Sequence, residues 1–236
     1  MLKVLAVQRG WLAVDKPYGM SVHNQPGEDL VSLLSGLIEA DQSLAEKLGI
    51  GSSIEIHPVH RLDKETSGVI LLSTGHQALA MLGDLFMNHR VQKRYIALVH
   101  GTFDEESKGA RYWEMPLTKT AGGRTDPAGK GRKVPCQTRY NVLQQSHRYA
   151  LLEIDLLTGR KHQIRRHAKL SGHPVTGDTR YGSKKSVQYL KQVLGYDRMG
   201  LHCKRLAFEI PGQKDKVVIE SFNPLSEMMQ LLSQDQ

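Results

Sequence analysis

The chain has 236 residues, 39% of them hydrophobic and 24% charged, and a formal net charge of +8 at pH 7. This length supports a hydrophobic core without disulfides or metals, and this composition excludes a disordered or fibrous protein. No apolar segment approaches the roughly 20 residues that span a bilayer, and the apolar run at the N-terminus is too short for a signal peptide. We therefore expect a cytoplasmic protein with one enzyme-sized domain over residues 1–236.

The first third of the chain alternates strands and helices. Residues 11–14 form a predicted strand that ends at a Pro/Gly turn. From residue 30 to 38 apolar side chains recur at helical spacing, with Asp29 placed as the N-cap. Residues 54–56 and 68–72 are apolar strands with a polar loop between them, which is a common setting for a functional site.

The middle of the chain predicts a second helix over residues 79–86 and strands over 94–100 and 148–157. Residues 118–135 are rich in Gly, Pro and Lys and indicate a long mobile loop or an irregular hairpin. A basic helix is expected from about residue 161 to 170, ended by Ser and Gly.

The last segment predicts strands near residues 201–210 and 217–222, followed by a helix that opens at Asn223 and Pro224. Helices interrupt the strands irregularly, and the late hairpin is antiparallel in style. This order favours an α+β fold with a mixed sheet over a doubly wound fold.

Positive charge is concentrated in two tracts. Residues 108–139 hold eight Lys/Arg against two acids, and residues 160–191 hold nine against one, so the remainder of the chain sums to −6. A basic surface beside an acidic remainder is typical of a polyanion-binding protein, with nucleic acid the leading candidate. The alternative is that these cations only solvate loops; a membrane surface is disfavoured because the tracts form no amphipathic helix.

Several sequence features that could indicate a nucleotide site, a metal site or a disulfide do not support one. Residues 177–184 have the length of a phosphate-binding loop, but Ser and Lys are exchanged and no strand precedes them. His162 and His167 would lie about 140° apart on a helix, which suits no single metal ion. Cys136 and Cys203 are distant in sequence and are expected to be reduced. We expect no metal and no nucleotide cofactor.

Asp63 and the basic helix form the remaining candidate site. Asp63 lies in the polar loop beside Arg61, where a carboxylate is either a turn former or a catalytic group. In the helix, Arg165 and Arg166 are expected on one side with His162, so that one Arg turns toward a carboxylate and the others bind phosphates. The alternative is a solvated basic face.

Six segments follow one another along the chain in a recognisable order: Asp15–Met20, His60–Gly68, Lys93–Tyr95, Thr158–His167, His173–Asp178 and Leu201–Cys203. Together they resemble successive motifs of the RluA family of pseudouridine synthases. Larger members of that family carry an N-terminal S4 domain, whereas the first motif here begins near residue 12, so no S4 domain is expected.

The resemblance implies a fold with a bent, mainly antiparallel sheet, flanking helices and a central basic cleft. It also implies an RNA substrate, tRNA or rRNA, in which a specific uridine is isomerised to pseudouridine. A stacked uridine hides its C1′ atom, so the nucleotide must be flipped out of the RNA before reaction. The enzyme is expected to act as a monomer.

The resemblance also implies roles for individual residues. Asp63 is the catalytic carboxylate, which either attacks C1′ or removes the 2′ proton. Arg165 pairs with Asp63, and Tyr95 stacks on the uracil and helps to remove the C5 proton. The expected substrate-binding residues are Arg61, which fills the gap left by the flipped base, the pocket residues Ile164 and Leu201, and the basic-segment residues Arg160, Lys161, His162 and Arg166.

Two other functions are compatible with the composition. One is a catalytically silent RNA-binding or RNA-chaperone module on the same fold, which the presence of Asp63, Tyr95 and Arg165 argues against. The other is a histidine-dependent nuclease, for which the eleven histidines show no suitable pairing with Lys.

Overall fold

The computed structural model describes residues 2–50, 54–104, 109–221 and 225–235. The chain forms two compact units, each built from segments that are distant in sequence. Residues 1–92 and 203–221 make up unit 1, and residues 93–202 and 222–236 make up unit 2.

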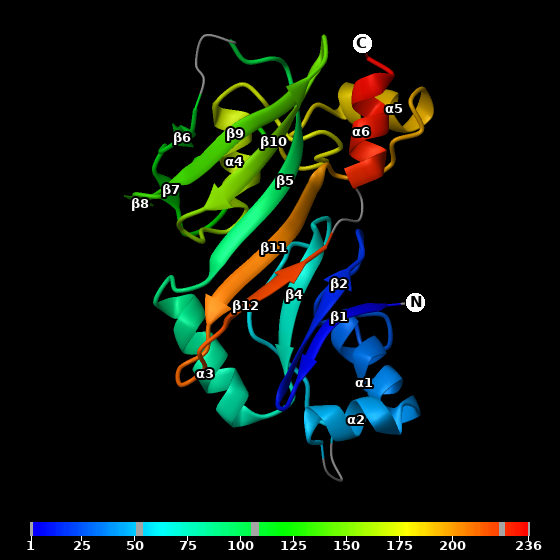
Figure 1. Ribbon diagram of the computed structural model, residues 1–236. Coiled ribbons are helices and arrows are strands. Elements are labelled where there is room, and N and C mark those ends of the chain that lie inside the picture. Colours follow the sequence, from blue (N-terminus) through cyan, green and yellow to red (C-terminus); the bar gives the residue numbers. More distant parts are fainter. Residues whose placement is uncertain (1, 51–53, 105–108, 222–224, 236) are drawn as a thin grey trace. The chain divides into compact units, whose positions relative to one another are not determined.

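Unit 1 combines an antiparallel set of strands with three helices among its described residues (Figure 1). Their bounds are β1 (Lys3–Gln8), β2 (Trp11–Lys16), α1 (Leu30–Ala40), α2 (Gln42–Leu48), β3 (His57–Pro58), β4 (Ser67–Ser73), α3 (His76–Met87), β11 (Leu201–Glu209, in unit 1 from residue 203) and β12 (Lys216–Glu220).

The centre of unit 1 is the pair β2 and β4, whose residues are all buried. β2 pairs antiparallel with both β1 and β4, and β12 pairs antiparallel with β11. Both strands of the central pair consist largely of Val, Ile, Leu and Ala, as expected for strands that are covered on two faces. The rings of Trp11 and Phe208 meet edge to face at 6.1 Å and add to this core.

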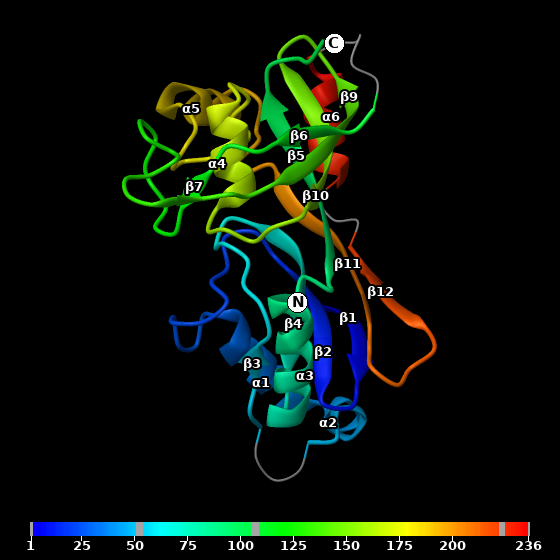
Figure 2. The same cartoon turned by 90° about the vertical axis from the view of Figure 1, so that its left-hand side faces the viewer.

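Unit 2 contains a second antiparallel strand set, seen from the side in Figure 2. The elements are β5 (Gln92–His100, in unit 2 from residue 93), β6 (Arg111–Trp113), β7 (Leu117–Thr118), β8 (Lys133–Val134), β9 (Thr138–Gln145), β10 (Tyr149–Leu156), α4 (Gln163–Leu170), α5 (Lys184–Gln192) and α6 (Leu225–Ser233).

The strands of unit 2 run in the order β5, β10, β9, β6, and each neighbouring pair is antiparallel. β7 and β8 form a separate two-stranded hairpin. α5 and α6 cover β5 and β10 through one hydrophobic cluster, made by Ile96, Leu98, Tyr149, Leu151, Leu190, Tyr196, Met228, Leu231 and Leu232. This packing fixes β5, the strand that carries Tyr95.

The predicted fold class is confirmed as α+β with mainly antiparallel strands. The Asp29 cap is confirmed, because its carboxylate accepts a 2.9 Å hydrogen bond from the Ser32 amide. The irregular-hairpin alternative for residues 118–135 is also confirmed by β7 and β8. The bend, the basic cleft and the single domain stay predictions. Within the described residues no helix is both long and apolar enough to cross a membrane.

Two local predictions need correction. Residues 54–56 are irregular, and the strand there is only His57–Pro58, since Pro58 has no N–H to donate to a ladder. The basic helix begins at Gln163 rather than residue 161, because His162 adopts a left-handed backbone with φ 54°. The helices α2 and α5 and the strands β6 and β9 were not predicted. The proposed helix opening at residues 223–224 lies outside the described residues.

Candidate active site

Asp63 lies in a tight turn of unit 1 between β3 and β4. Its main-chain carbonyl accepts a 3.0 Å hydrogen bond from the Thr66 amide, and its side chain is partly exposed. Leu62 before it and Thr66 after it are both buried. The turn therefore holds the carboxylate at the surface while its two flanks are fixed in the core.

A buried lysine anchors this turn. Lys16 at the end of β2 is inaccessible to solvent, and its Nζ donates to the carbonyls of Pro17, Met20 and Lys64 at 2.9–3.1 Å. The Gly19 amide donates to the same Lys64 carbonyl at 3.0 Å. The segment after β2 and the Asp63 turn are thus joined by a charge-assisted network, whose cation is the last residue of β2.

A histidine fixes the N-terminal part of the loop that carries Asp63. The Nε2 atom of His60 accepts a 3.1 Å hydrogen bond from the Leu71 amide, and its ring stacks on Phe86 at 4.5 Å. His60 is thereby fixed between β4 and α3. Arg61, the predicted gap-filling residue, is exposed next to it.

Gly68 shows why the motif ends in glycine. Its φ is +112°, and a Cβ atom added there would lie 2.3 Å from the Cys203 carbonyl oxygen on β11. No side chain fits this backbone approach. Cys203 is fully buried, and both cysteines are free thiols as predicted.

Arg165 is a buried residue of α4 in unit 2. Its Nε and Nη2 atoms donate to the two carboxylate oxygens of Asp178 at 2.7 and 2.9 Å. Arg165 is 2% exposed and Asp178 is 1% exposed, and the guanidinium lies 5.3 Å from the centre of the Tyr181 ring. Asp178 also accepts hydrogen bonds from the amides of Arg180 and Tyr181. Asp178 is therefore a positioning partner that sequence reasoning missed.

Arg166 does not bind phosphate as predicted. It is fully buried, and its guanidinium makes five hydrogen bonds, to the carbonyls of Pro127, Ala128, Thr118 and Lys161 and to the Thr118 hydroxyl. Guanidinium has five N–H donors, so none remains for a substrate. The alternative of a solvated basic face does not hold for this part of α4, because six of its residues are buried, whereas the expectation that one Arg faces a carboxylate agrees with Arg165 and Asp178.

The start of α4 is organised by Gln163. Its side-chain oxygen accepts hydrogen bonds from the Thr158 hydroxyl and the Arg160 amide, both at 2.9 Å. Its side-chain nitrogen donates to the Gln137 carbonyl and the Thr138 hydroxyl. The turn that precedes the helix is thus held against β9, which leaves the side chains of Arg160 and Lys161 exposed.

His162 occupies the left-handed position just before α4. Such a conformation is uncommon outside glycine, and here a 2.9 Å hydrogen bond between His162 Nδ1 and the Tyr181 hydroxyl holds it. The predicted pocket residues Ile164 and Leu201 are both buried, at 4% and 3% exposure. Their lining role stays a prediction.

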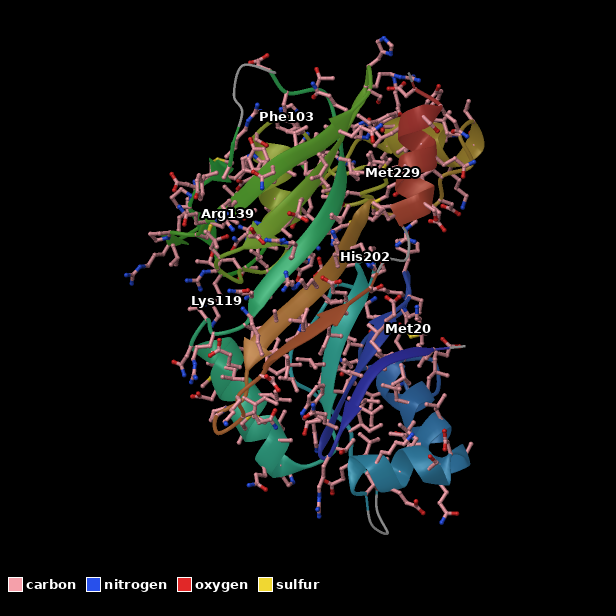
Figure 3. The ribbon with its side chains drawn as sticks, viewed as in Figure 1. Met20, Phe103, Lys119, Arg139, His202 and Met229 are labelled. Atoms are coloured by element: carbon pink, nitrogen blue, oxygen red, sulfur yellow. The ribbon has the colours of Figure 1, made fainter. Side chains whose placement is uncertain are left out.

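Tyr95 is 7% exposed on β5 and pairs with Ile154 on β10. The adjacent register position carries an ion-pair network, in which Asp155 accepts 2.9 Å and 2.6 Å hydrogen bonds from Arg94 and Arg139 (labelled in Figure 3). Burial raises the pKa of Asp155, but the hydrogen bonds from the two arginines outweigh it and hold that pKa below its usual value. The network clamps β10 to both neighbouring strands beside Tyr95.

Two histidines of unit 2, the buried His167 and the half-buried His100, are expected to make stability depend on pH. Burial lowers the pKa of His167, and the charge of Arg166 lowers it further; burial also lowers the pKa of His100. As the pH falls, these histidines therefore bind protons more readily in the unfolded chain than in the folded chain. We expect the free energy of unfolding to fall as the pH decreases below about 6.5, by up to about 1.4 kcal/mol per pH unit for each histidine.

Urea denaturation at intervals between pH 7.5 and 5.5 measures this slope. His100→Asn should flatten it, whereas His89→Asn, at an exposed position of unit 1, should leave it unchanged. A stability that is constant over this range would contradict the assignment.

The structure thus supplies the candidate residues in two sets. Asp63 and Arg61 belong to unit 1, and Tyr95, Arg165, Ile164 and Leu201 belong to unit 2. The pairing of Asp63 with Arg165 stays a prediction. The residues that position these side chains, above all Lys16, Gln163 and Asp178, are found from the structure.

Comparison with known proteins gives a matching family model and solved structures with a similar fold. The model of a family described as RNA pseudouridylate synthase matches residues 10–170. Human RNA pseudouridylate synthase domain containing 4 superposes with a TM-score of 0.72 at 25% identity, covering 97% of this chain and 92% of its own. Human RNA pseudouridylate synthase domain containing 1 has a TM-score of 0.71 at 23% identity, over 95% and 84% of the two chains.

Two curated relatives differ in how much of their length is matched. Ribosomal large subunit pseudouridine synthase C of Vibrio cholerae is 34% identical over 213 residues, which is 89% of this chain but 62% of the relative. tRNA pseudouridine synthase C of Haemophilus ducreyi is 30% identical over 229 residues, covering 94% of this chain and 90% of the relative. The chain therefore spans about three fifths of the first relative and most of the second.

Proposed function

The chain belongs to the RNA pseudouridylate synthase family, and on this premise we propose that it isomerises specific uridines in RNA to pseudouridine. The observation that carries the proposal is the match over residues 10–170, which includes the turn with Asp63 together with Tyr95 and Arg165. The buried anchors around that turn and around Arg165 support it, because a reacting group must be held rigidly.

The proposed reaction is an intramolecular transfer. The bond between C1′ and N1 of uridine breaks, the uracil turns, and C5 joins C1′ while the C5 proton is lost and N1 gains one. Asp63 either attacks C1′ and is later displaced, or removes the 2′ proton to give a glycal. Arg165 favours the ionised carboxylate, and Tyr95 stacks on the uracil and assists removal of the C5 proton. Atoms balance without an added reactant.

The proposed substrate is tRNA or rRNA. The relatives that match this chain carry names that refer to the ribosomal large subunit in one case and to tRNA in another. The proposal includes a cytoplasmic location, where such RNA is found, and action as a monomer.

Exposed cations of unit 2 form the proposed RNA-binding surface. The β7–β8 hairpin exposes Lys119 (labelled in Figure 3), Lys130, Arg132 and Lys133. Contacts of such side chains with phosphates release counterions and supply affinity that does not depend on sequence. This affinity offsets the cost of flipping the target nucleotide out of its stack.

Neutralising part of the hairpin should weaken RNA binding and its salt dependence. A Lys130→Gln/Arg132→Gln/Lys133→Gln variant is expected to bind less tightly, with the slope of log K against log salt reduced by about 0.7–0.9 for each phosphate that is no longer neutralised. Filter binding from about 50 to 300 mM salt measures the slope. This is the range of salt concentration over which the effect is useful.

The matched control removes three exposed lysines from unit 1, Lys3, Lys47 and Lys214, as a triple Gln variant. It changes the net charge of the chain by the same amount as the hairpin variant. Should both variants show the same decrease in affinity and slope, the assignment to the hairpin would be wrong and only net charge would matter.

The proposed activity is tested directly with RNA labelled with tritium at uracil C5. An active synthase releases tritium to water, because C5 exchanges its hydrogen for the bond to C1′. Total RNA from cells that lack this protein supplies unmodified target sites. Binding of RNA without tritium release would instead support the catalytically silent RNA-binding module, which the family match does not favour.

A further inference from the structure

Unit 1 contains a cluster of potential metal ligands that is separate in sequence from the Asp63 turn. Glu55, His57 and His76 place a carboxylate oxygen and two imidazole nitrogens within 4.8 Å of one another. The Glu55 Oε2 atom lies 3.5 Å from His57 Nε2 and 3.6 Å from His76 Nε2. We propose that these three side chains bind one divalent transition-metal ion of the zinc type.

Local structure explains how the three side chains meet. Glu55 lies two residues before His57, the first residue of β3, and the two side chains approach within ion-pair distance. His57 is opposite Ser73 in the β3–β4 register, and the chain then turns through Thr74 and Gly75 into α3, whose first residue is His76. The cluster therefore joins the entry of β3 to the first turn of α3.

The distances fit metal ligands better than an ion pair. A charge-assisted hydrogen bond between imidazolium and carboxylate is about 2.7–2.9 Å long, which is much shorter than either separation. In a tetrahedral site with bonds of about 2.0–2.2 Å, ligand atoms lie about 3.3–3.6 Å apart. Both separations from Glu55 match that edge.

His57 gives an independent reason for a ligand. Its Nε2 atom is shielded from solvent and has no hydrogen-bond partner among the residues that the structure describes. A buried polar atom without a partner is unfavourable, and a metal ion at the centre of the cluster would satisfy it. The centres of the two imidazole rings lie 5.5 Å apart.

The donor set defines the class of ion. Two imidazoles and one carboxylate suit Zn²⁺, Co²⁺, Ni²⁺ or Cu²⁺ and not Mg²⁺ or Ca²⁺, which prefer oxygen ligands. Three protein ligands leave a fourth position for water. The positive N-terminal end of α3 weakly opposes a cation, and the negative charge of Glu55 offsets this effect.

The inference goes beyond the proposed function and departs from the expectation that the chain binds no metal. Residue spacing alone carries no signal for this cluster, because His76 is nineteen positions after His57 and is brought beside it only by the β3–β4 pairing. The expected effect of the ion is to cross-link the two ends of the segment that carries the Asp63 turn.

The test is a titration of the untagged chain with Co²⁺. Binding is monitored by the visible absorption of the bound cobalt. We expect one ion per chain, with the intense d–d bands of tetrahedral cobalt and no thiolate charge-transfer band, because the ligands are N and O. Zn²⁺ should displace the cobalt and raise the thermal midpoint. Absence of binding, or a spectrum with thiolate bands from Cys136 or Cys203, would overturn the proposal.

Variants assign the ligands. His76→Asn should weaken Co²⁺ binding more than about tenfold. The His76 side chain is 83% exposed, so this variant is expected to fold. His57→Asn and Glu55→Gln should act in the same direction, and His89→Asn, an exposed histidine outside the cluster, should bind cobalt like the unmodified chain. Equal binding by His76→Asn and His89→Asn would disprove the site.

Discussion

An Asp63→Asn variant is expected to lose pseudouridine formation by at least about 1,000-fold, equivalent to about 4 kcal/mol of transition-state stabilisation. Asparagine has nearly the same shape but is neither a nucleophile nor a base at neutral pH. The fold should survive, because it is the main-chain carbonyl of residue 63 that accepts the Thr66 hydrogen bond and the side chain is partly exposed. RNA affinity should also persist, since it depends on cations elsewhere.

Tritium release under single-turnover conditions measures the loss, and circular dichroism and filter binding measure fold and affinity. Glu65→Gln, which removes a partly exposed carboxylate from the same turn, is the matched control and should stay active. Asp63→Ala guards against slow reversion of asparagine to aspartate. Substantial turnover by the Ala variant would refute the assignment of Asp63.

The second large effect is expected on stability. Asp178→Asn should lower the free energy of unfolding by about 3–5 kcal/mol, because it removes the negative charge that faces the buried Arg165 guanidinium. Both side chains are almost inaccessible, so water cannot replace the missing interaction. Urea denaturation at pH 7.5 measures the change.

Asp197→Asn provides the contrast, because Asp197 pairs with Lys191 at 2.7 Å while both side chains are about 60% exposed. An exposed pair of this kind is expected to contribute less than about 1 kcal/mol. A cycle with Arg165→Met, Asp178→Leu and the double variant isolates the coupling energy. Equal destabilisation by Asp178→Asn and Asp197→Asn would show that burial adds nothing to the Arg165–Asp178 pair.

The elements that sequence predicted well have strong local patterns. α1 combines apolar residues at helical spacing with an Asp cap, and β2 and β4 are apolar runs between turn residues. α5 has few apolar residues and a single buried one, Leu190, so its periodicity was too weak to detect. β9 is partly buried along most of its length and shows no clear alternation.

The basic helix shows where sequence reasoning stops. The expectation that one of its arginines turns toward a carboxylate agrees with the Arg165–Asp178 pair, but Arg166, expected on phosphate, is bound instead by the carbonyls of residues 118, 127 and 128. Carbonyl oxygens exist at every residue and leave no trace in a sequence. The same reason hid the role of Lys16, whose acceptors are also main-chain atoms.

The attachment of the β7–β8 hairpin has a consequence for protein engineering. Arg166 holds the hairpin mainly through backbone oxygens, which every amino acid supplies. Surface positions such as Lys119, Lys130, Arg132 and Lys133 are therefore open to randomisation without detaching the hairpin from its support. A library at these positions, selected on a chosen transcript, would be a practical route to redirecting the RNA preference of the proposed activity.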